Sequence, residues 1–216
     1  MTQHGHDIVW TIVVAGGSSQ RFGRPKQYES IGETRIIDLS VAVARAASSG
    51  VVVVVPAADV DAEGGVAGGR TRSESVRNGL KGVPDDATII CVHDAARPFA
   101  DVALFDAVIA AVVGGAACAV PGVAVTDTIK LVDPDGAVVA TPERAALRAV
   151  QTPQAFRASA LRAAHDSGAE GTDDAALVEA MGGLVVVVDG ADDNRKITVP
   201  ADLDWARDRA RQTARR

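Results

Sequence analysis

A glycine turn followed by two cations comes directly after the first apolar segment of the sequence. The stretch VVAGGSSQRFGRPKQY, residues 13–28, contains Gly16 and Gly17, then Arg21 and Lys26. Glycines let the backbone turn tightly and approach a ligand, and the successive N–H groups of such a turn form a concave anion site. Arg21 can fork onto phosphate oxygens, and Lys26 adds a point charge. The stretch predicts a loop that binds phosphates.

Two common phosphate-binding fingerprints are absent from this stretch. G-x-G-x-x-G would indicate a dinucleotide-dependent dehydrogenase and G-x-x-x-x-G-K-[ST] a P-loop NTPase, and residues 13–28 match neither. The alternative interpretation is a structural glycine turn with two solvated cations. The sequence also has no Cys/His cluster with zinc spacing and no G-x-S-x-G nucleophile elbow.

A second cluster, VHDAARPF at residues 92–99, follows the apolar run ATIIC. Asp94 and Arg97 would then lie at the carboxyl end of a strand, the edge where open α/β sheets bind ligands. Asp94 could hold a hydroxyl group or a metal ion, Arg97 a phosphate, and the small Ala95 and Ala96 leave room for a flat ring. The alternative is an Asp–Arg pair that ties a loop. His93 is better explained by a buried structural role than by catalysis.

The segment GGRTRSESV, residues 68–76, precedes a helical pattern. Ser73 or Ser75 can cap that helix, and either hydroxyl could contact the edge of a base. Arg72 and Arg77 are interpreted as surface charges, one of which could face the site.

Polar residues also mark element ends in the second half of the chain. Thr152 and Gln154 flank Pro153, which fixes the local backbone, and Lys196 follows the last apolar run, near the expected ligand edge. Thr172, followed by two acidic residues, is predicted to cap a helix.

Short apolar runs alternate with helical patterns along the chain. The runs are β-branched and nearly continuous, as in strands buried on both faces of a parallel sheet, and cover 7–15, 51–56, 87–94, 117–122 and 184–190. Helical spacing covers 36–47, 72–81, 101–113, 158–166, 173–181 and 201–211, and Asp101 can cap the third of these helices. This alternation predicts a single three-layer α/β domain over residues 1–216, with a mostly parallel sheet and a flexible tail at 1–7.

One segment interrupts the alternation. Residues 123–150 are expected to form two alternating strands around a DPDG turn, and the protruding part, about 123–146, is expected to be an arm. A lone two-stranded ribbon is only marginally stable in water, so such an arm often reaches a second subunit. A second departure is the stretch between 56 and 67, which leaves little room for a helix and a strand.

The bulk composition narrows the class of protein. Hydrophobic residues make up 47% and aromatic residues 3% of 216 residues, and the net charge is −6, which disfavours a general nucleic-acid binder. No segment has the length and flanks of a membrane span, and no signal peptide opens the sequence. Cys91 and Cys118 lie in apolar runs and are expected to be buried, reduced thiols of a cytoplasmic protein.

Taken in order, the motifs resemble those of the 2-C-methyl-D-erythritol 4-phosphate cytidylyltransferase family of the non-mevalonate isoprenoid pathway. The blocks that carry the resemblance are HDAARP, TDTIK, QTPQ and KITVPADL, and the likeness covers residues 8–203. It implies a Rossmann-like α/β fold and a homodimer interlocked by the hairpin arms.

The resemblance also implies roles for individual residues. The nucleotide would be lined by Ala15, Gly16, Gly17, Ser75 and Ala95, and the CTP triphosphate would be gripped by Arg21 and Lys26. The sugar phosphate would be held by Asp94, Arg97, Thr128, Arg144, Thr152 and Lys196, with Arg144 above all coming from the partner's arm. Arg21, Lys26, Arg144 and Lys196 would act on the reacting groups. Mg²⁺ would be bound chiefly by the CTP phosphates, with Asp94 as a further contact.

Two alternatives to this activity stay open. The family usually has a second alanine where this chain has Gly16, its loop is two residues longer, and an acidic residue is common at the position of Arg70. Because ribitol-5-phosphate cytidylyltransferases open with AGG, a ribitol or other polyol phosphate is the first alternative acceptor. A nucleotide-binding protein that has lost catalysis is the second alternative.

Overall fold

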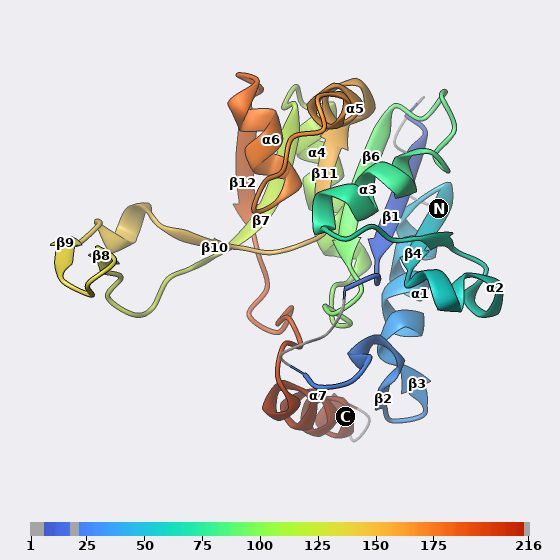
Figure 1. Cartoon of the computed structure of the whole chain (residues 1–216), viewed down its shortest axis with the longest axis horizontal. Helices are drawn as coiled ribbons and strands as arrows, with labels where there is room; N and C mark the ends of the chain where they lie inside the picture. Colours follow the sequence, from blue (N-terminus) through green and yellow to red (C-terminus); the bar gives the residue numbers. More distant parts are fainter. Residues whose placement is uncertain (1–6, 18–21, 214–216) are drawn as a thin grey trace.

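A central sheet organises the molecule. The computed structural model describes residues 7–17 and 22–213. Its main sheet contains β1 (Val9–Val14), β4 (Gly50–Val55), β5 (Val66–Ala67), β6 (Ile89–Asp94), β7 (Cys118–Ala124), β10 (Arg148–Val150), β11 (Gln154–Arg157) and β12 (Val185–Asp189). The order runs β10-β7-β11-β6-β1-β4-β5, and β12 pairs with β7 (Figure 1).

Most neighbouring strands are parallel. β1 lies between β4 and β6 and is parallel to both. β5 is also parallel to β4, and β12 is parallel to β7. β11 is antiparallel to both β6 and β7, and β10 is antiparallel to β7. The strand at β11 was not expected, because the QTPQAF stretch lacks a long β-branched run.

Helices cover both faces of the sheet. α1 (Ile36–Ala47) and α4 (Val102–Val113) pack on one face, in a cluster that includes Val13, Cys91 and Phe105. α3 (Arg72–Leu80), α5 (Ala158–Asp166) and α6 (Asp174–Ala180) pack on the other face, with Ile12 and Phe156. Successive strand residues point to opposite faces, so both faces of β1 and β6 are apolar. The predicted three-layer α/β fold with a mostly parallel sheet is confirmed.

A smaller cluster closes the ligand end of the sheet. α7 (Pro200–Thr213) packs near β2 (Ser30–Ile31) and β3 (Thr34–Arg35), with Phe22, Ile36 and Ile197 buried between them. Ile197 is anchored by its backbone N–H, which donates to the carbonyl of Ala96 at 2.8 Å. This contact fixes the chain on either side of Lys196 against the end of β6.

The residues that cap three helices can be compared with the capping residues predicted from the sequence. Two of the predictions are wrong and one is confirmed. Thr71 caps α3 by accepting from the backbone N–H of Glu74, in place of Ser73 or Ser75. Asp173 caps α6 by accepting from Ala176, in place of Thr172. Asp101 caps α4 as predicted. In the two corrected cases a neighbouring residue also had a capping side chain, and the sequence alone did not set the helix start to within one or two residues.

The short stretch between 56 and 67 does contain a helix and a strand. η2 (Ala57–Asp59) and α2 (Val60–Glu63) are followed by a turn at Gly64, whose φ is 62°, and then by β5. The elements are present but minimal, which explains why the apolar spacing gave no sign of them.

The segment around the DPDG turn extends away from the body in Figure 1. Within it, β8 (Leu131–Val132) and β9 (Val138–Ala140) form a separate antiparallel pair. The carboxylate of Asp133 accepts from the backbone N–H groups of Asp135 and Ala137, which sets the turn. The two strands are shorter than the sequence suggested, because residues 148–150 return to the main sheet as β10.

No helix in the described ranges is long and apolar enough to cross a membrane.

Candidate active site

A cavity of about 720 Å³ opens at the carboxyl ends of β1 and β6, where α3 begins. Eight of the residues predicted to bind ligands line it: Ala15, Gly16, Gly17, Lys26, Ser75, Asp94, Ala95 and Lys196. The cavity is also lined by Val14, Gln27, Gly69, Arg70, Thr71, Arg72, Ala96 and Thr198, of which Arg72 had been considered only as one of two arginines that could face the site. Segments far apart in the sequence therefore meet at one edge of the sheet, as expected for an open α/β fold.

The glycine turn lies against the segment that precedes α3. A Cβ atom on Gly16 would come within 3.3 Å of the Cα atom of Gly68, so the two backbones approach closely here and a side chain at this position would require a small shift of the facing segment. Ser75 stabilises the facing segment, because its hydroxyl accepts from the N–H of Gly69 at 3.0 Å and donates to the carbonyl of Thr71 at 2.9 Å. The glycine turn and the segment before α3 therefore line the cavity with closely spaced backbone.

Lys26 begins a short 3-10 helix, η1 (Lys26–Tyr28), at the other side of the cavity. Tyr28 ties this turn to the body, since its hydroxyl donates to Asp59 at 2.6 Å and the guanidinium of Arg35 lies 5.7 Å from the centre of its ring. Burial and the hydrogen bond to Asp59 raise the pKa of Tyr28 above its ordinary value. The lysine is thus carried by an anchored turn. Arg21 lies outside the described residues.

Asp94, the last residue of β6, is the meeting point of the cations. Its Oδ2 accepts from Nζ of Lys196 at 2.6 Å, and its Oδ1 lies 3.4 Å from Nε of Arg72. Burial by itself would raise the pKa of Asp94, but Arg72, Lys196 and Arg97 together hold it well below its ordinary value. The carboxylate is therefore ionised, and it holds two cationic side chains at the mouth of the cavity.

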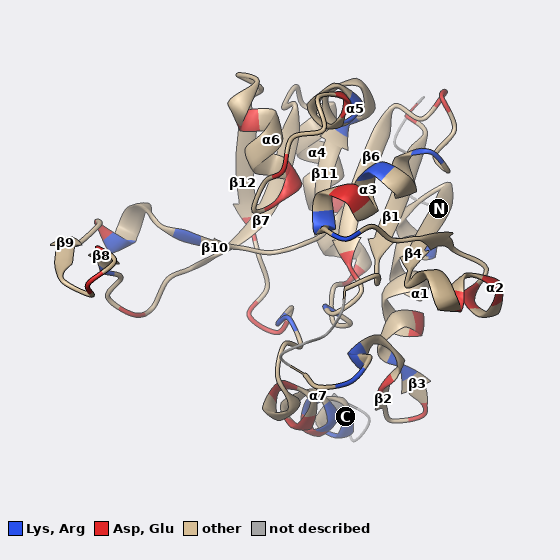
Figure 2. Cartoon of the chain, in the orientation of Figure 1, with Lys and Arg blue, Asp and Glu red and all other residues tan. Residues whose placement is uncertain are grey.

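Arg72 is the functional residue that the sequence interpretation underrated. It lies at the start of α3, lines the cavity, and reaches Asp94 on one side and Asp174 on the other. Figure 2 places the basic start of α3 beside the acidic start of α6. Burial opposes its charge, yet the two carboxylates raise the pKa of Arg72 above its ordinary value. Only the long-range contact between β6, α3 and α6 distinguishes it from Arg77.

Thr152 forms a hydrogen bond with the backbone of Asp94, and His93 contacts Thr152. The hydroxyl of Thr152 accepts from the backbone N–H of Asp94 at 3.0 Å and lies 3.1 Å from Nδ1 of His93. Burial, with a contribution from Arg97, lowers the pKa of His93 to about 4, and its ring packs against Phe105. His93 is thus a neutral, buried structural residue. Thr152 contacts the functional strand rather than the cavity itself.

Arg97 does not line the cavity. Its Nη1 donates to the carbonyl of Asn194 at 2.7 Å and its Nη2 to that of Val150 at 3.3 Å. Burial lowers the pKa of Arg97, partly offset by Asp94. Among the residues described, the contacts of Arg97 match the alternative interpretation of a residue that ties loops, in this case the root of the arm and the loop before Lys196.

Thr128 and Arg144 lie on the arm. Both are exposed, and Nη1 of Arg144 donates to the carbonyl of Thr126 within the arm at 2.8 Å. Neither residue lines the cavity of its own chain. The structure therefore separates these two from Asp94 and Lys196, the two residues predicted to hold the sugar phosphate that do line the cavity.

Acidic metal ligands are sparse in the cavity. Asp94 is the one carboxylate among the described residues that line it, and no group of three or more His, Cys, Asp and Glu residues with metal-binding geometry occurs in the described ranges. A magnesium ion that keeps its waters and binds mainly to substrate phosphates is compatible with such a site.

Comparison with known proteins adds independent evidence. The sequence profile of the 2-C-methyl-D-erythritol 4-phosphate cytidylyltransferase family matches residues 9–211. A protein of that name from Frankia casuarinae is 44% identical over 208 residues, which cover 90% of this chain and 78% of the relative.

Solved structures agree. A Thermus thermophilus structure of the same name has a TM-score of 0.79 at 32% identity, and covers 95% of this chain and 99% of its own. A 4-diphosphocytidyl-2C-methyl-D-erythritol synthase from Anaerococcus prevotii has a TM-score of 0.84 at 26% identity, with coverage of 95% and 99%. These findings confirm the resemblance carried by the motifs. The chain belongs to the 2-C-methyl-D-erythritol 4-phosphate cytidylyltransferase family of nucleotidyltransferases.

Proposed function

We propose that this chain transfers CMP from CTP to 2-C-methyl-D-erythritol 4-phosphate in the cytoplasm, and that the cavity at the ends of β1 and β6 is its active site. A phosphate oxygen of the acceptor attacks the α-phosphorus of CTP, the bond to the β-phosphate breaks, and pyrophosphate leaves. The observation that carries this assignment is the convergence of the glycine turn, Lys26 and the Arg72–Asp94–Lys196 group on one cavity.

The nucleotide would lie along the glycine turn. Ala15, Gly16, Gly17, Ser75 and Ala95 all line the cavity, and the close approach of Gly16 to Gly68 favours a flat base over a bulky group. Lys26, together with Arg21, would meet the triphosphate. Cations already in place stabilise the negative charge that builds on the phosphate oxygens and fix the line of attack.

Magnesium would be carried chiefly by the triphosphate, and Asp94 would be the carboxylate of the cavity available to it. When bound, the ion would neutralise phosphate charge and make pyrophosphate a better leaving group. Because both oxygens of Asp94 already contact cations, the protein's main contribution is to place Lys26 and Lys196 around the phosphates.

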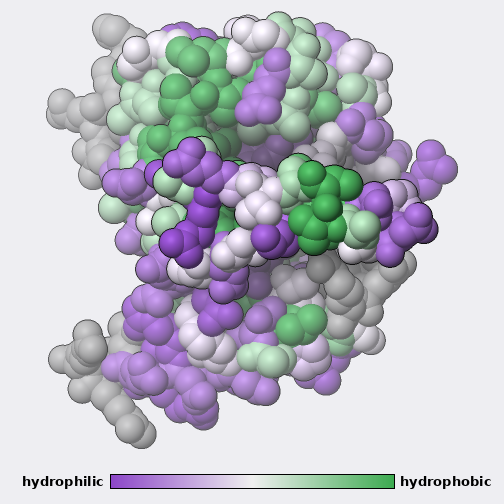
Figure 3. All heavy atoms as spheres, turned by 90° about the vertical axis from the view of Figure 1, so that its left-hand side faces the viewer, coloured by the Kyte–Doolittle hydropathy of each residue, from purple (hydrophilic) through white to green (hydrophobic). Residues whose placement is uncertain are grey.

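The acceptor would lie against Asp94 and Lys196, which also line the cavity. Asp94 can accept hydrogen bonds from polyol hydroxyls, and Lys196 can bind the phosphate. Thr128 and Arg144 would complete the site from the arm of a second subunit, since neither lines the cavity of its own chain. Figure 3, which views the molecule from the side of the arm, shows hydrophobic residues near the viewer, and Leu131, Val132, Val138 and Val139 are all exposed. An apolar arm of this kind favours pairing with another copy.

The activity is tested by following pyrophosphate release from CTP and Mg²⁺ with one acceptor at a time. We expect release with 2-C-methyl-D-erythritol 4-phosphate, little with ribitol 5-phosphate, and none after chelation with EDTA. ATP, GTP and UTP serve as nucleotide controls. Release with ribitol 5-phosphate alone would change the acceptor, and CTP binding without release from either acceptor would contradict catalysis.

Replacement of Lys26 tests the role of the anchored turn. We expect Lys26→Ala to lower kcat by roughly 100-fold or more, because it removes a preorganised cation next to the reacting phosphates. Lys81→Ala, which changes an exposed lysine at the end of α3, is the control and should keep normal turnover. Near-normal activity in the Lys26 variant would refute this role.

Complementation between two inactive chains tests the shared site. Lys26→Ala and Arg144→Ala chains carrying different tags are co-expressed, and the mixed dimer is isolated through both tags. If each arm serves the partner's cavity, one of the two sites in this dimer has both wild-type residues, so roughly half of the wild-type activity should return. A mixed dimer as inactive as its parents would show that Arg144 does not act across the interface.

A further inference from the structure

A buried carboxylate, Asp174, contacts one of the cationic side chains that line the cavity. Asp174, the first residue of α6, is fully buried, and its Oδ2 accepts from Nη1 of Arg72 at 2.5 Å. Its Oδ1 lies 2.9 Å from Nε2 of His165. We infer that Asp174 is a positioning residue for cytidylyl transfer: it anchors Arg72 and, through Arg72, holds Asp94 in place for the acceptor. The inference rests on the proposed function of the cavity.

Arg72 bridges two carboxylates that come from different elements. Nε faces Asp94 at the end of β6, and Nη1 faces Asp174 at the start of α6. A guanidinium is a rigid planar fork, so two contacts fix the orientation of its plane. The contact to Asp94, at 3.4 Å, is the longer of the two. The shorter contact to the buried Asp174 therefore sets where the guanidinium lies.

The two cations that contact Asp94 differ in exposure and in their other contacts. The side chain of Lys196 is 40% exposed and pairs with Asp94 alone among the described residues, whereas that of Arg72 is 25% exposed and also pairs with Asp174. When a phosphorylated acceptor arrives, Lys196 can turn to its phosphate while Arg72 stays and keeps Asp94 aligned. Asp174 thus makes Arg72 the fixed member of the pair.

The anchor is specific to Asp174. The neighbouring Asp173 is occupied elsewhere, since its carboxylate accepts from Gln154 and from the backbone N–H of Ala176. His165, itself buried, contacts the second oxygen of Asp174 and orients that carboxylate. Loss of Asp174 would leave Arg72 with Asp94 as its remaining ion-pair partner among the described residues.

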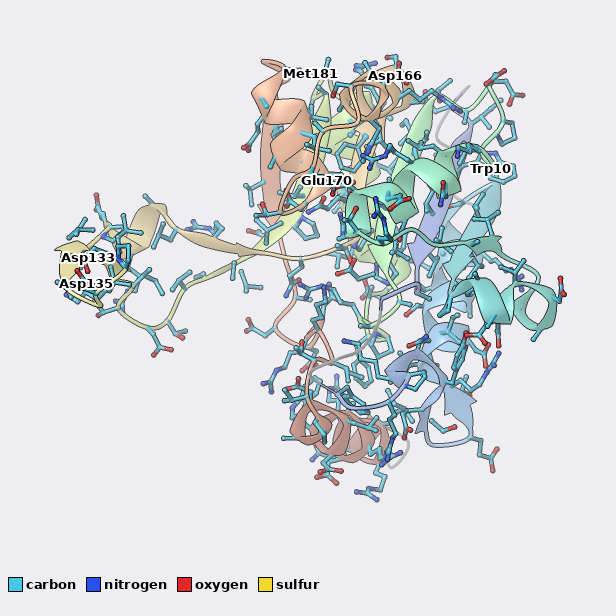
Figure 4. The ribbon with its side chains drawn as sticks, viewed as in Figure 1. Trp10, Asp133, Asp135, Asp166, Glu170 and Met181 are labelled. Carbon is cyan, nitrogen blue, oxygen red and sulfur yellow. The ribbon has the colours of Figure 1, made fainter. Side chains whose placement is uncertain are left out.

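A second ion pair between the same parts of the chain supplies the control. Arg77 of α3 pairs at 2.7 Å with Glu170, which lies on the loop before α6 and is labelled in Figure 4. Neither residue lines the cavity. Glu170→Gln therefore removes one carboxylate that links α3 to this segment, as Asp174→Asn does, without touching the proposed site.

A double-mutant cycle tests the inference through kinetics. Asp174→Asn should raise KM for the acceptor by roughly 10- to 100-fold, as small misplacements of a binding group do, with a much smaller change in KM for CTP. In an Arg72→Gln background the same change should add little, because its effect passes through Arg72. Glu170→Gln should leave both KM values unchanged. Equal shifts in both KM values, or losses that simply add, would overturn the inference.

A second readout does not depend on turnover. In ¹⁵N NMR spectra, an anchored guanidinium rotates slowly and gives separate Nη signals. We expect separate signals for Arg72 in the wild type and in Glu170→Gln, and averaged signals in Asp174→Asn. Separate signals in Asp174→Asn would overturn the anchor even if the enzyme is active as proposed. If Asp174→Asn does not fold, Asp174→Glu, which keeps the charge but displaces the carboxylate, replaces it in both experiments with the same expected outcomes.

Discussion

The carboxylate of Asp94, held between Arg72 and Lys196 at the end of β6, is the interaction on which the geometry of the site depends. A buried carboxylate is stable only when it is paired, and two cations brought this close need an anion between them. The parallel pairing of β6 with β1 places Asp94 next to the glycine turn. The contact between Ile197 and Ala96 brings Lys196 to the same place. One ionised group therefore fixes the relative positions of three segments.

This arrangement explains how a chain of net charge −6 can bind two polyanions. The positive charge is local. Lys26, Arg72 and Lys196 lie around one cavity, and each is carried by an element anchored elsewhere in the fold. Charges placed before the substrate arrives need little reorganisation during the reaction, which is the main source of catalysis in phosphoryl transfer.

Local signals in the sequence predicted the helices and most strands well. The helices at 36–47 and 158–166 begin and end where the apolar spacing indicates, and the HDAARP motif located Asp94 at a strand end. The roles of Arg72 and Arg97 were not predictable in this way. Arg72 lines the cavity and pairs with Asp174, more than a hundred residues away, and Arg97 turns to carbonyl groups at 150 and 194. Such pairings depend on tertiary contacts that periodicity and capping do not encode.

The sequence did not predict the strand β11, for a related reason. Four residues following the arm insert between β6 and β7, where their neighbours rather than their own propensity decide the structure. Family motifs, in contrast, identified the family without knowledge of any of these contacts.

A crystal structure of the protein with CTP and Mg²⁺ tests the central claim most directly. The account predicts the base between the glycine turn and the segment before α3, the triphosphate within reach of Lys26, and Asp94 still in contact with Arg72. A nucleotide bound outside this cavity, or an Asp94 turned away from Arg72 with Lys26 remote from the phosphates, would contradict it.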